Sequence, residues 1–230
     1  MSDFLHIATI VLCGMVQISL QLSLGVLILL HRSSQSHHRR RKTRRLAYSF
    51  ILGCAAICFL AVSSACFFIS RTENGRLNIS TLAVIIGVLL GCAIAMWAVY
   101  YRRGKNTQLW LPKNFTKFIQ KRAKECSDGA EAFSLGLVSA FAEMPISLAL
   151  FIVAANSILH LQDNLAILAA IIYPFFCCIP LFIMRAQVSS GKNLAEVQRW
   201  RIKNKSFLRV VSGGGFAVLA AFIYAFWVVQ

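Results

Sequence analysis

The sequence predicts an all-α membrane protein with six transmembrane helices. Of its 230 residues, 58% are hydrophobic and only 14% are charged, and the mean hydropathy of +0.67 is well above that of a soluble domain of this length. The apolar residues gather in stretches of about 20, the length that a spanning helix needs. The charged residues lie mostly between these stretches. We therefore expect a multi-pass protein of the cell membrane.

The apolar stretches number six, and their bounds define the predicted helices. The predicted spans are residues 4–30, 46–69, 79–101, 132–159, 165–184 and 207–229. The first span is too long for the core of a signal peptide, and it lacks both a basic region before it and a convincing small-residue cleavage site. We therefore keep it as a membrane helix.

Basic residues alternate between the two sides of the predicted membrane. The connections 31–45, 102–131 and 185–209 carry seven, eight and seven lysines or arginines, whereas the other connections carry only Arg71 and Arg76. By the positive-inside rule, both termini face the non-cytoplasmic side. The net charge of +16 favours contact with anionic lipids of the inner leaflet. The basic run at residues 37–45 lacks an aromatic platform or a recognised binding fold, so no nucleic-acid partner is expected.

The first and fourth helices are weakly similar when they are aligned with an offset of 122 residues. The matched pairs are Gly14 with Gly136, Val16 with Val138, Gln21 with Glu143 and Gly25 with Ser147. Because each half contains three helices, equivalent helices run in opposite directions. This predicts a 3+3 inverted repeat, an architecture of transporters. Trp97 and Trp227, which close the third and sixth helices, fit this pattern as interface aromatics.

The predicted domains follow from the repeat. Residues 1–101 form the first three-helix repeat, residues 102–131 a basic cytoplasmic connector, and residues 132–230 the second repeat. Within the connector, apolar and basic residues after Pro112 predict a short interfacial helix on the inner leaflet. Asp128 and Glu131 have the spacing of a capping box that starts the fourth helix.

Glu143 is the one acidic residue within a predicted span. A charge at that depth costs at least about 2.5–3.5 kcal/mol, so this side chain has to face protein or a wet cavity. Pro145, two residues later, removes a backbone donor and crowds the carbonyl of Phe141, which predicts a kink beside the acid. Freed carbonyl groups next to a carboxylate favour a proton or cation site.

Polar residues of the first helix complete the expected site. Gln21 corresponds to Glu143 in the repeat, and Gln17 precedes Gln21 by one helical turn. We also include Ser139 of the fourth helix among the expected site residues. An alternative is that these groups only hydrogen-bond between helices, with a neutral Glu143 carboxyl because burial disfavours its charged form.

Glycines and prolines predict packing contacts and hinges. The expected packing or hinge glycines are Gly14, Gly25 and Gly136. Close packing, with hinge motion as the alternative, is also expected at the Gly87–Gly91 pair and at Gly213 to Gly215. Pro174 and Pro180 are expected to break the fifth helix twice, with a bend as the alternative.

Motifs of soluble enzymes are absent from the sequence, which contains no HExxH, GxSxG, Walker loop or GxGxxG. We therefore expect no enzyme activity, no cofactor and no metal site. The eight cysteines include no CxxC pair. Cys54 and Cys58 share a helix face, and Cys177 and Cys178 are adjacent, but small packing residues are the more common role of such cysteines in apolar helices.

The segment GAEAFSLGLVSAFAEMPISLAL, together with the 3+3 topology, resembles the superfamily of small six-helix proteins that includes the lysine exporters and the thiol carriers of cytochrome c biogenesis. The thiol carriers have a cysteine pair in the first and fourth helices. Here Cys13 is present, but Leu135 occupies the symmetric position. The lysine exporters have a proline motif in both helices. Here Pro145 is present in the fourth helix, but the corresponding position in the first helix is Ser23. The resemblance implies transport without identifying the substrate.

The favoured hypothesis is a secondary exporter of a small solute that works by alternating access, with Glu143 as the proton or cation site. One alternative is a transmembrane thiol redox carrier, which requires two cysteines close enough to form a disulfide. Another is a non-transporting assembly or lipid-handling factor, in which Glu143 is only structural. The sequence leaves a homodimer open.

Overall fold

The computed structural model of the chain describes residues 3–20, 40–72, 77–100, 128–189 and 204–228, and six residues between 119 and 126. All elements in these ranges are helices. The predicted connector 102–131 lies largely outside the described residues, as do Gln21, Ser23 and Gly25. Their predicted roles are not addressed by the structure.

The described helices follow the predicted spans closely. They are α1 (Asp3–Leu20), α3 (Arg40–Ser70), α4 (Ile79–Ala95), the π-helix η1 (Met96–Tyr100), α6 (Gly129–Leu159), α7 (Asp163–Cys177), α8 (Ile179–Ser189), α10 (Lys205–Ile223) and the π-helix η2 (Tyr224–Val228). Five of the described helices are long and apolar enough to cross a membrane, and the number is six if the bent pair of α7 and α8 forms one span. The prediction of an all-α protein with several membrane-spanning helices is confirmed.

Large apolar side chains cover the outside of the bundle as well as its interior. Exposed examples occur on each long helix and include Phe4, Phe68, Val84, Phe141, Ile167 and Val210. In water such a surface would be unfavourable, whereas acyl chains match it. This exposed apolar surface is consistent with a multi-pass membrane protein.

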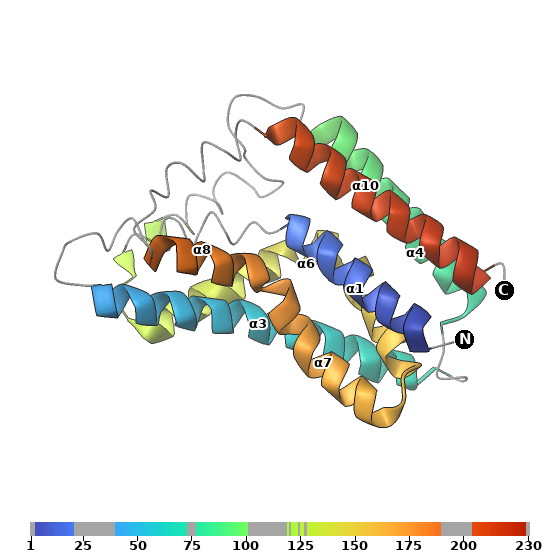
Figure 1. Cartoon of the computed structure of the whole chain (residues 1–230), viewed down its shortest axis with the longest axis horizontal. Coiled ribbons are helices and arrows are strands. Elements are labelled where there is room, and N and C mark those ends of the chain that lie inside the picture. Colours follow the sequence, from blue (N-terminus) through green and yellow to red (C-terminus); the bar gives the residue numbers. More distant parts are fainter. Residues whose placement is uncertain are drawn as a thin grey trace.

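The helices form two groups with α1 between them (Figure 1). In one group α3 packs along α6, with α7 and α8 beside them, and in the other α4 pairs with α10. Helix α1 contacts α6, α7 and α10, so it connects both groups. The two chain termini lie at the same end of the molecule.

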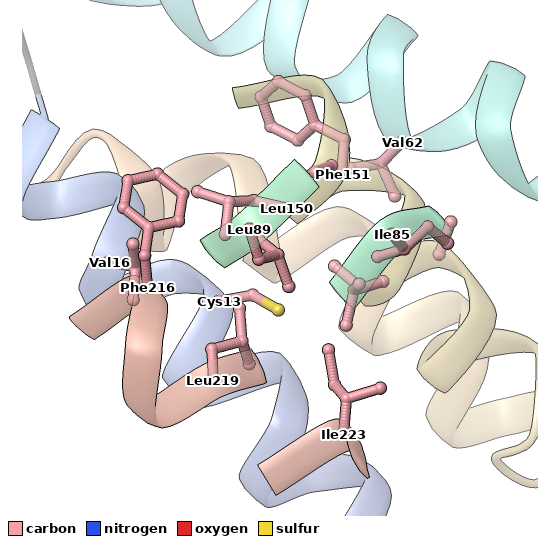
Figure 2. Close-up of a cluster of buried hydrophobic side chains, with 14 of the residues drawn as sticks. Cys13, Val16, Val62, Ile85, Leu89, Leu150, Phe151, Phe216, Leu219 and Ile223 are labelled. Carbon is pink, nitrogen blue, oxygen red and sulfur yellow. The ribbon is translucent and has the colours of Figure 1, made fainter. Parts of the chain in front are cut away.

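The larger hydrophobic cluster lies where the two groups meet. Figure 2 shows Cys13 and Val16 of α1 among side chains from α3, α4, α6 and α10. Phe216, Leu219 and Ile223 of α10 are each fully buried there. A second cluster joins α3, α6 and α8 around Phe50 and Leu181. Burial of these side chains fixes α1 as the central helix.

Helix α3 and helix α6 approach each other at two glycines. A Cβ atom on Gly136 would lie 2.2 Å from the carbonyl oxygen of Phe50, and one on Gly53 would lie 2.2 Å from that of Phe133. Neither distance is possible for a real side chain, so only glycine permits this crossing. The predicted packing role of Gly136 agrees with this contact, whereas Gly53 was not among the predicted residues.

Gly87 and Gly91 have no such contact. A Cβ atom on either would meet nothing within 4 Å in the described part of the chain. The described residues therefore make no close packing contact at this pair. Gly213 does pack closely, because its Cβ position would overlap the indole ring of Trp97, and Gly215 packs against Val16, whereas Gly214 has no such contact in the described part of the chain.

The fifth span breaks once rather than twice. Helices α7 and α8 are bent by 45° at Cys178. Pro174 lies inside α7, and Pro180 is the second residue of α8. In the first turn of a helix an N–H group has no carbonyl partner within the helix, so a proline there breaks no hydrogen bond. The two prolines thus flank one break.

The predicted capping box at the start of α6 is also only partly correct. Asp128 does precede the helix in an extended conformation, but its side chain makes no capping hydrogen bond. The start of the helix was predicted correctly, whereas the capping contact expected from the Asp128 side chain is not formed.

Candidate functional site at Glu143

Glu143 lies inside the bundle, with 6% of its surface exposed. Ser139 and Ser147 lie one turn away on either side of it, and both are buried. The Ser147 hydroxyl donates a hydrogen bond to the backbone carbonyl of Glu143 over 3.0 Å. These three residues form a polar stripe along the buried face of α6. Since water cannot solvate this stripe, the bundle itself has to solvate Glu143.

Pro145 lies on the opposite side of the helix. The residue is exposed, as is Phe141, whose carbonyl group it deprives of a hydrogen bond. Helix α6 continues through Pro145 without interruption. We predicted that Pro145 frees carbonyl groups near Glu143. This stays a prediction, and the arrangement does not favour it, because Pro145 and Phe141 face away from Glu143.

Gln17 of α1 is also buried, at 3% exposure. Its Oε1 atom accepts no hydrogen bond from the part of the chain that the structure describes. A buried amide oxygen without a donor costs about 1–3 kcal/mol. This atom is therefore available to a ligand or to a water molecule. Its neighbour one turn away, Cys13, points into the same interior.

Cysteines from two further segments lie near Glu143. The side chains of Cys58 in α3 and Cys178 at the α7–α8 break are close neighbours. Cys58 and Cys177 are both close enough to Glu143 to interact with it electrostatically. This group of thiols and one carboxyl joins α3, α6 and the break in the fifth span.

Cys13 extends the group to α1. Its thiol lies near that of Cys177. The hydroxyl group of the buried Tyr173 side chain lies near the same thiol but has no hydrogen-bond partner among the described residues. All eight cysteines are unpaired by disulfides. We call Cys13, Cys58, Cys177 and Cys178 the thiol cluster. Two of its members, Cys58 and Cys177, lie near the one buried acid of α6.

The sequence contained a partial signal for the thiol cluster. The adjacent pair Cys177–Cys178 and the position of Cys58 were noted as packing residues, and the structure shows them buried in the core. What the sequence could not reveal is that the two segments meet, because this depends on how α3 packs against the broken fifth span. Tyr173 carried no signal of its own.

A second polar cluster closes the end of the molecule where both termini lie. The rings of His6 and His160 are stacked, with centroids 5.0 Å apart and planes at 18°. The ring of Trp227 lies 5.9 Å from that of His6 and 6.1 Å from that of His160. Nδ1 of His160 lies 2.7 Å from the Asn156 carbonyl oxygen. This cluster connects α1, the end of α6 and η2. Trp227 was predicted as an interface aromatic, but no sequence pattern indicated that it meets the two histidines.

The predicted packing glycines of the first and fourth helices occupy related positions. Gly136 in α6 packs against Phe50 of α3, and Gly14 in α1 packs against the ring of Phe176 of α7. In the predicted repeat, α1 corresponds to α6 and the second span to the fifth. Each glycine therefore contacts the equivalent helix of the other half. Val16 and Val138, in contrast, differ, since only Val16 is buried.

No metal site of three or more ligands occurs among the described residues. Comparisons of the chain with protein-family models, with curated proteins and with solved structures find no match. Function therefore has to be argued from the site itself.

Proposed function

We propose that this protein is a secondary transporter that exports a small solute by alternating access, with Glu143 as its proton or cation site. The observation that carries the proposal is the burial of an ionisable carboxyl group in the middle of a spanning helix. Such groups are costly in membranes and occur where they pair with something or bind something. Here the neighbours are thiols and hydroxyl groups, and Gln17 of α1 adds a free amide oxygen. A ligand or proton would offset the cost of burial.

An inverted repeat supports alternating access. In the predicted repeat, α1 corresponds to α6, α3 to the broken α7–α8 span, and α4 to α10. The contact of α3 with α6 then corresponds to the contact of α1 with α7. The contact of α1 with α10 likewise corresponds to that of α6 with α4. All four contacts occur, and the glycine pair Gly14 and Gly136 follows the same relation. Two related halves can present one central site to each side in turn.

The topology belongs to the same proposal. With both termini outside, as the distribution of basic residues indicates, the cluster of His6, His160 and Trp227 lies at the outer end of the α1–α6 contact. It would close the central site from that side. The basic connections would lie against the anionic inner leaflet. The resemblance to the small six-helix exporters is consistent with this arrangement.

The test compares small metabolites inside and outside cells that lack the protein and are supplied with one of three variants at matched expression. The variants are the wild type, Glu143→Gln and Glu131→Gln. Glu131 lies in the exposed first turn of the same helix, so its substitution is the matched control. We expect one solute to accumulate without the protein, and wild type and Glu131→Gln to relieve this. Glu143→Gln should fail.

The proposal is wrong if the wild type, Glu143→Gln and the cells without the protein are indistinguishable. In that case a structural role of Glu143, as in an assembly or lipid-handling factor, would be favoured. Membrane levels of each variant are measured in parallel, so that loss of folding is not mistaken for loss of transport.

A second candidate function is favoured by the adjacent thiols of Cys58 and Cys178. In a redox carrier these two thiols would give two electrons and two protons to a quinone or a protein disulfide, and would form one disulfide bond. This pair lies in the second and fifth spans, not in the first and fourth spans that the thiol carriers use. Mass spectrometry after alkylation separates the candidates, because only a redox carrier cycles between alkylatable and protected forms.

A further inference from the structure

The stacked imidazole rings of His6 and His160 are titratable groups that proton binding at Glu143 leaves unused. Their centroids are 5.0 Å apart and their planes are inclined by only 18°. His6 is a buried residue near the start of α1, and His160 directly follows the last residue of α6. The pair therefore joins the ends of two helices that have to separate if the bundle opens on this side.

The hydrogen bond of His160 identifies the ring atom that can take up a proton. Nδ1 of His160 lies 2.7 Å from the backbone carbonyl oxygen of Asn156. A carbonyl oxygen can only accept a hydrogen bond, so Nδ1 carries a hydrogen atom and donates it. In the neutral ring Nε2 then carries no hydrogen atom and can take up a proton. Protonation of Nε2 keeps the bond to Asn156 and makes the ring a cation.

One positive charge is compatible with the stack. Histidine is the side chain that ordinarily changes its charge between pH 5 and pH 8. The centroid of the Trp227 ring lies 5.9 Å from that of His6 and 6.1 Å from that of His160. These distances are in the range in which an aromatic ring attracts a cation. A single proton on the pair therefore leaves the three rings together.

A second positive charge is not compatible with the stack. Two protonated rings would place unit charges about 5.0 Å apart. His6 is only 5% exposed, so little water screens their repulsion. Burial of the second charge adds to the cost. Movement of α1 away from the end of α6 removes both costs, because it separates the rings and admits water.

The other charged groups at this end of the bundle do not compensate for a second proton. Within the described chain they are Asp3 in α1, Arg71 after α3 and Asp163 at the start of α7. By sequence, α4, η2 and the part of α6 that follows Glu143 contribute none, and α10 has its basic residues in its first turns at the opposite end. Two negative charges and one positive charge sum to one negative unit. This balances one proton on the pair and not two.

We propose that the stack of His6 and His160 is a proton-sensitive closure, which holds α1 against the end of α6 at neutral pH and releases it when both rings are protonated. That this closure covers the site at Glu143 rests on the proposed function, whereas its response to protons does not. Cys13 lies seven residues after His6, two turns further along the same face of α1, and is completely buried (Figure 2). Release of α1 would therefore expose Cys13.

The experiment measures the alkylation of Cys13 by N-ethylmaleimide between pH 8 and pH 5, in the purified, reduced full chain in detergent. Peptide mass spectrometry assigns the label to Cys13. The test variants are His6→Phe and His160→Phe, which keep a ring at each position but cannot be protonated there. The matched control is His37→Phe, at a histidine of the basic connection. Because a thiol reacts more slowly as the pH falls, the wild-type rate is divided by the rate of each variant at the same pH.

We expect this ratio to be close to one at pH 8 and to reach at least about ten at pH 5 for both test variants. Two unit charges 5.0 Å apart repel by more than the roughly 1.4 kcal/mol that corresponds to a tenfold change in an equilibrium. His37→Phe should respond to acid as the wild type does. Slow labelling at pH 8 also shows that a variant is folded. If a phenylalanine variant labels rapidly at pH 8, the corresponding glutamine variant, which is also neutral at every pH, takes its place.

The inference is overturned if the ratio stays near one at pH 5 because Cys13 of the wild type remains protected. It is also overturned if both test variants are opened by acid as readily as the wild type. Another group, such as Asp3, Asp163 or Glu143, would then be responsible for the response.

Closure and transport fail separately. If Cys13 responds to acid through the two histidines while Glu143→Gln has no effect on any exported solute, the closure is supported and the proposed transport is wrong. If a solute depends on Glu143 while Cys13 remains protected at pH 5, only the proton-sensitive closure is wrong.

Discussion

The contact between α3 and α6 and the contact between α1 and α7 are related by the predicted repeat, yet they differ in what opposes each glycine. Gly136 and Gly53 both face backbone carbonyl oxygens of the neighbouring helix, whereas Gly14 faces the side chain of Phe176. A backbone cannot turn away from an added methyl group, but an aromatic ring can. The α3–α6 contact is therefore rigid, and the α1–α7 contact can yield.

This difference indicates which parts of the bundle can move. Helices α3 and α6 are held by reciprocal backbone contacts and should move as one unit. Helix α1 packs on side chains of α7 and α10, which can adjust in small steps. In alternating access, we therefore expect α1 to shift against a fixed α3–α6 pair, which changes the distance between Gln17 and Glu143.

The largest effect is expected for Gly136→Ala. Overpacking a close interior costs about 1–3 kcal/mol, and alanine returns up to about 1 kcal/mol through helix propensity. Because the opposing atom belongs to the backbone, we expect a net loss of about 2 kcal/mol in the free energy of unfolding. Denaturant titration in detergent measures it. An unchanged stability would mean that α3 and α6 separate easily, and the rigid contact would then be rejected.

The double variant Gly53→Ala/Gly136→Ala sharpens the same comparison. Both methyl groups would push apart the same pair of helices, so the second should cost less once the first is present. We expect the two losses to fall short of additivity by at least about 0.5 kcal/mol, as for residues that share a contact. Strictly additive losses would show that the two glycines act at independent points. Both single variants are measured under identical conditions.

A smaller effect is expected for Gly14→Ala. The ring of Phe176 is half-buried and can rotate aside, at a cost of about 0.5–1.5 kcal/mol if it leaves its preferred rotamer. We therefore expect a loss below that of Gly136→Ala. In a Phe176→Leu background, which removes the ring, Gly14→Ala should cost less still. If Gly14→Ala is as damaging as Gly136→Ala, the α1–α7 contact is as rigid as α3–α6.

The smallest effect is expected for Gly87→Ala and Gly91→Ala. Nothing in the described chain lies within 4 Å of a Cβ atom at either position, so the stability should be unchanged or slightly higher through helix propensity. These variants are the controls for the glycine substitutions above. A marked loss, accompanied by dissociation of an oligomer, would instead show that this face of α4 packs against a second copy of the chain.

The spans were predictable because lipid imposes a simple requirement on sequence. A run of about 20 apolar residues both buries its backbone polar groups and matches the membrane core, so the bounds of α3, α4, α6 and α10 agree with the prediction to within about six residues. Internal irregularities were less predictable. The break at Cys178 lies between two prolines, and local sequence does not decide which turn absorbs the bend.

The site was predicted in part. A single acid in an apolar span has few acceptable positions, so the burial of Glu143 followed from its cost. The orientation of Pro145 did not follow, because a position two residues away along a helix lies on nearly the opposite face. The meeting of Cys58 with Cys178 depended on contacts between segments 120 residues apart in the chain.

The sequence by itself determined that the chain is helical, how many apolar spans it has, and that Glu143 has to be buried. These properties depend on the balance between each segment and its solvent, which local composition records. Only the tertiary structure decided which helices touch, that Gly53 joins Gly136 in a backbone contact, and that Cys58 and Cys177 lie near the acid. Those outcomes depend on close packing between distant segments, where a single methyl group changes which surfaces fit.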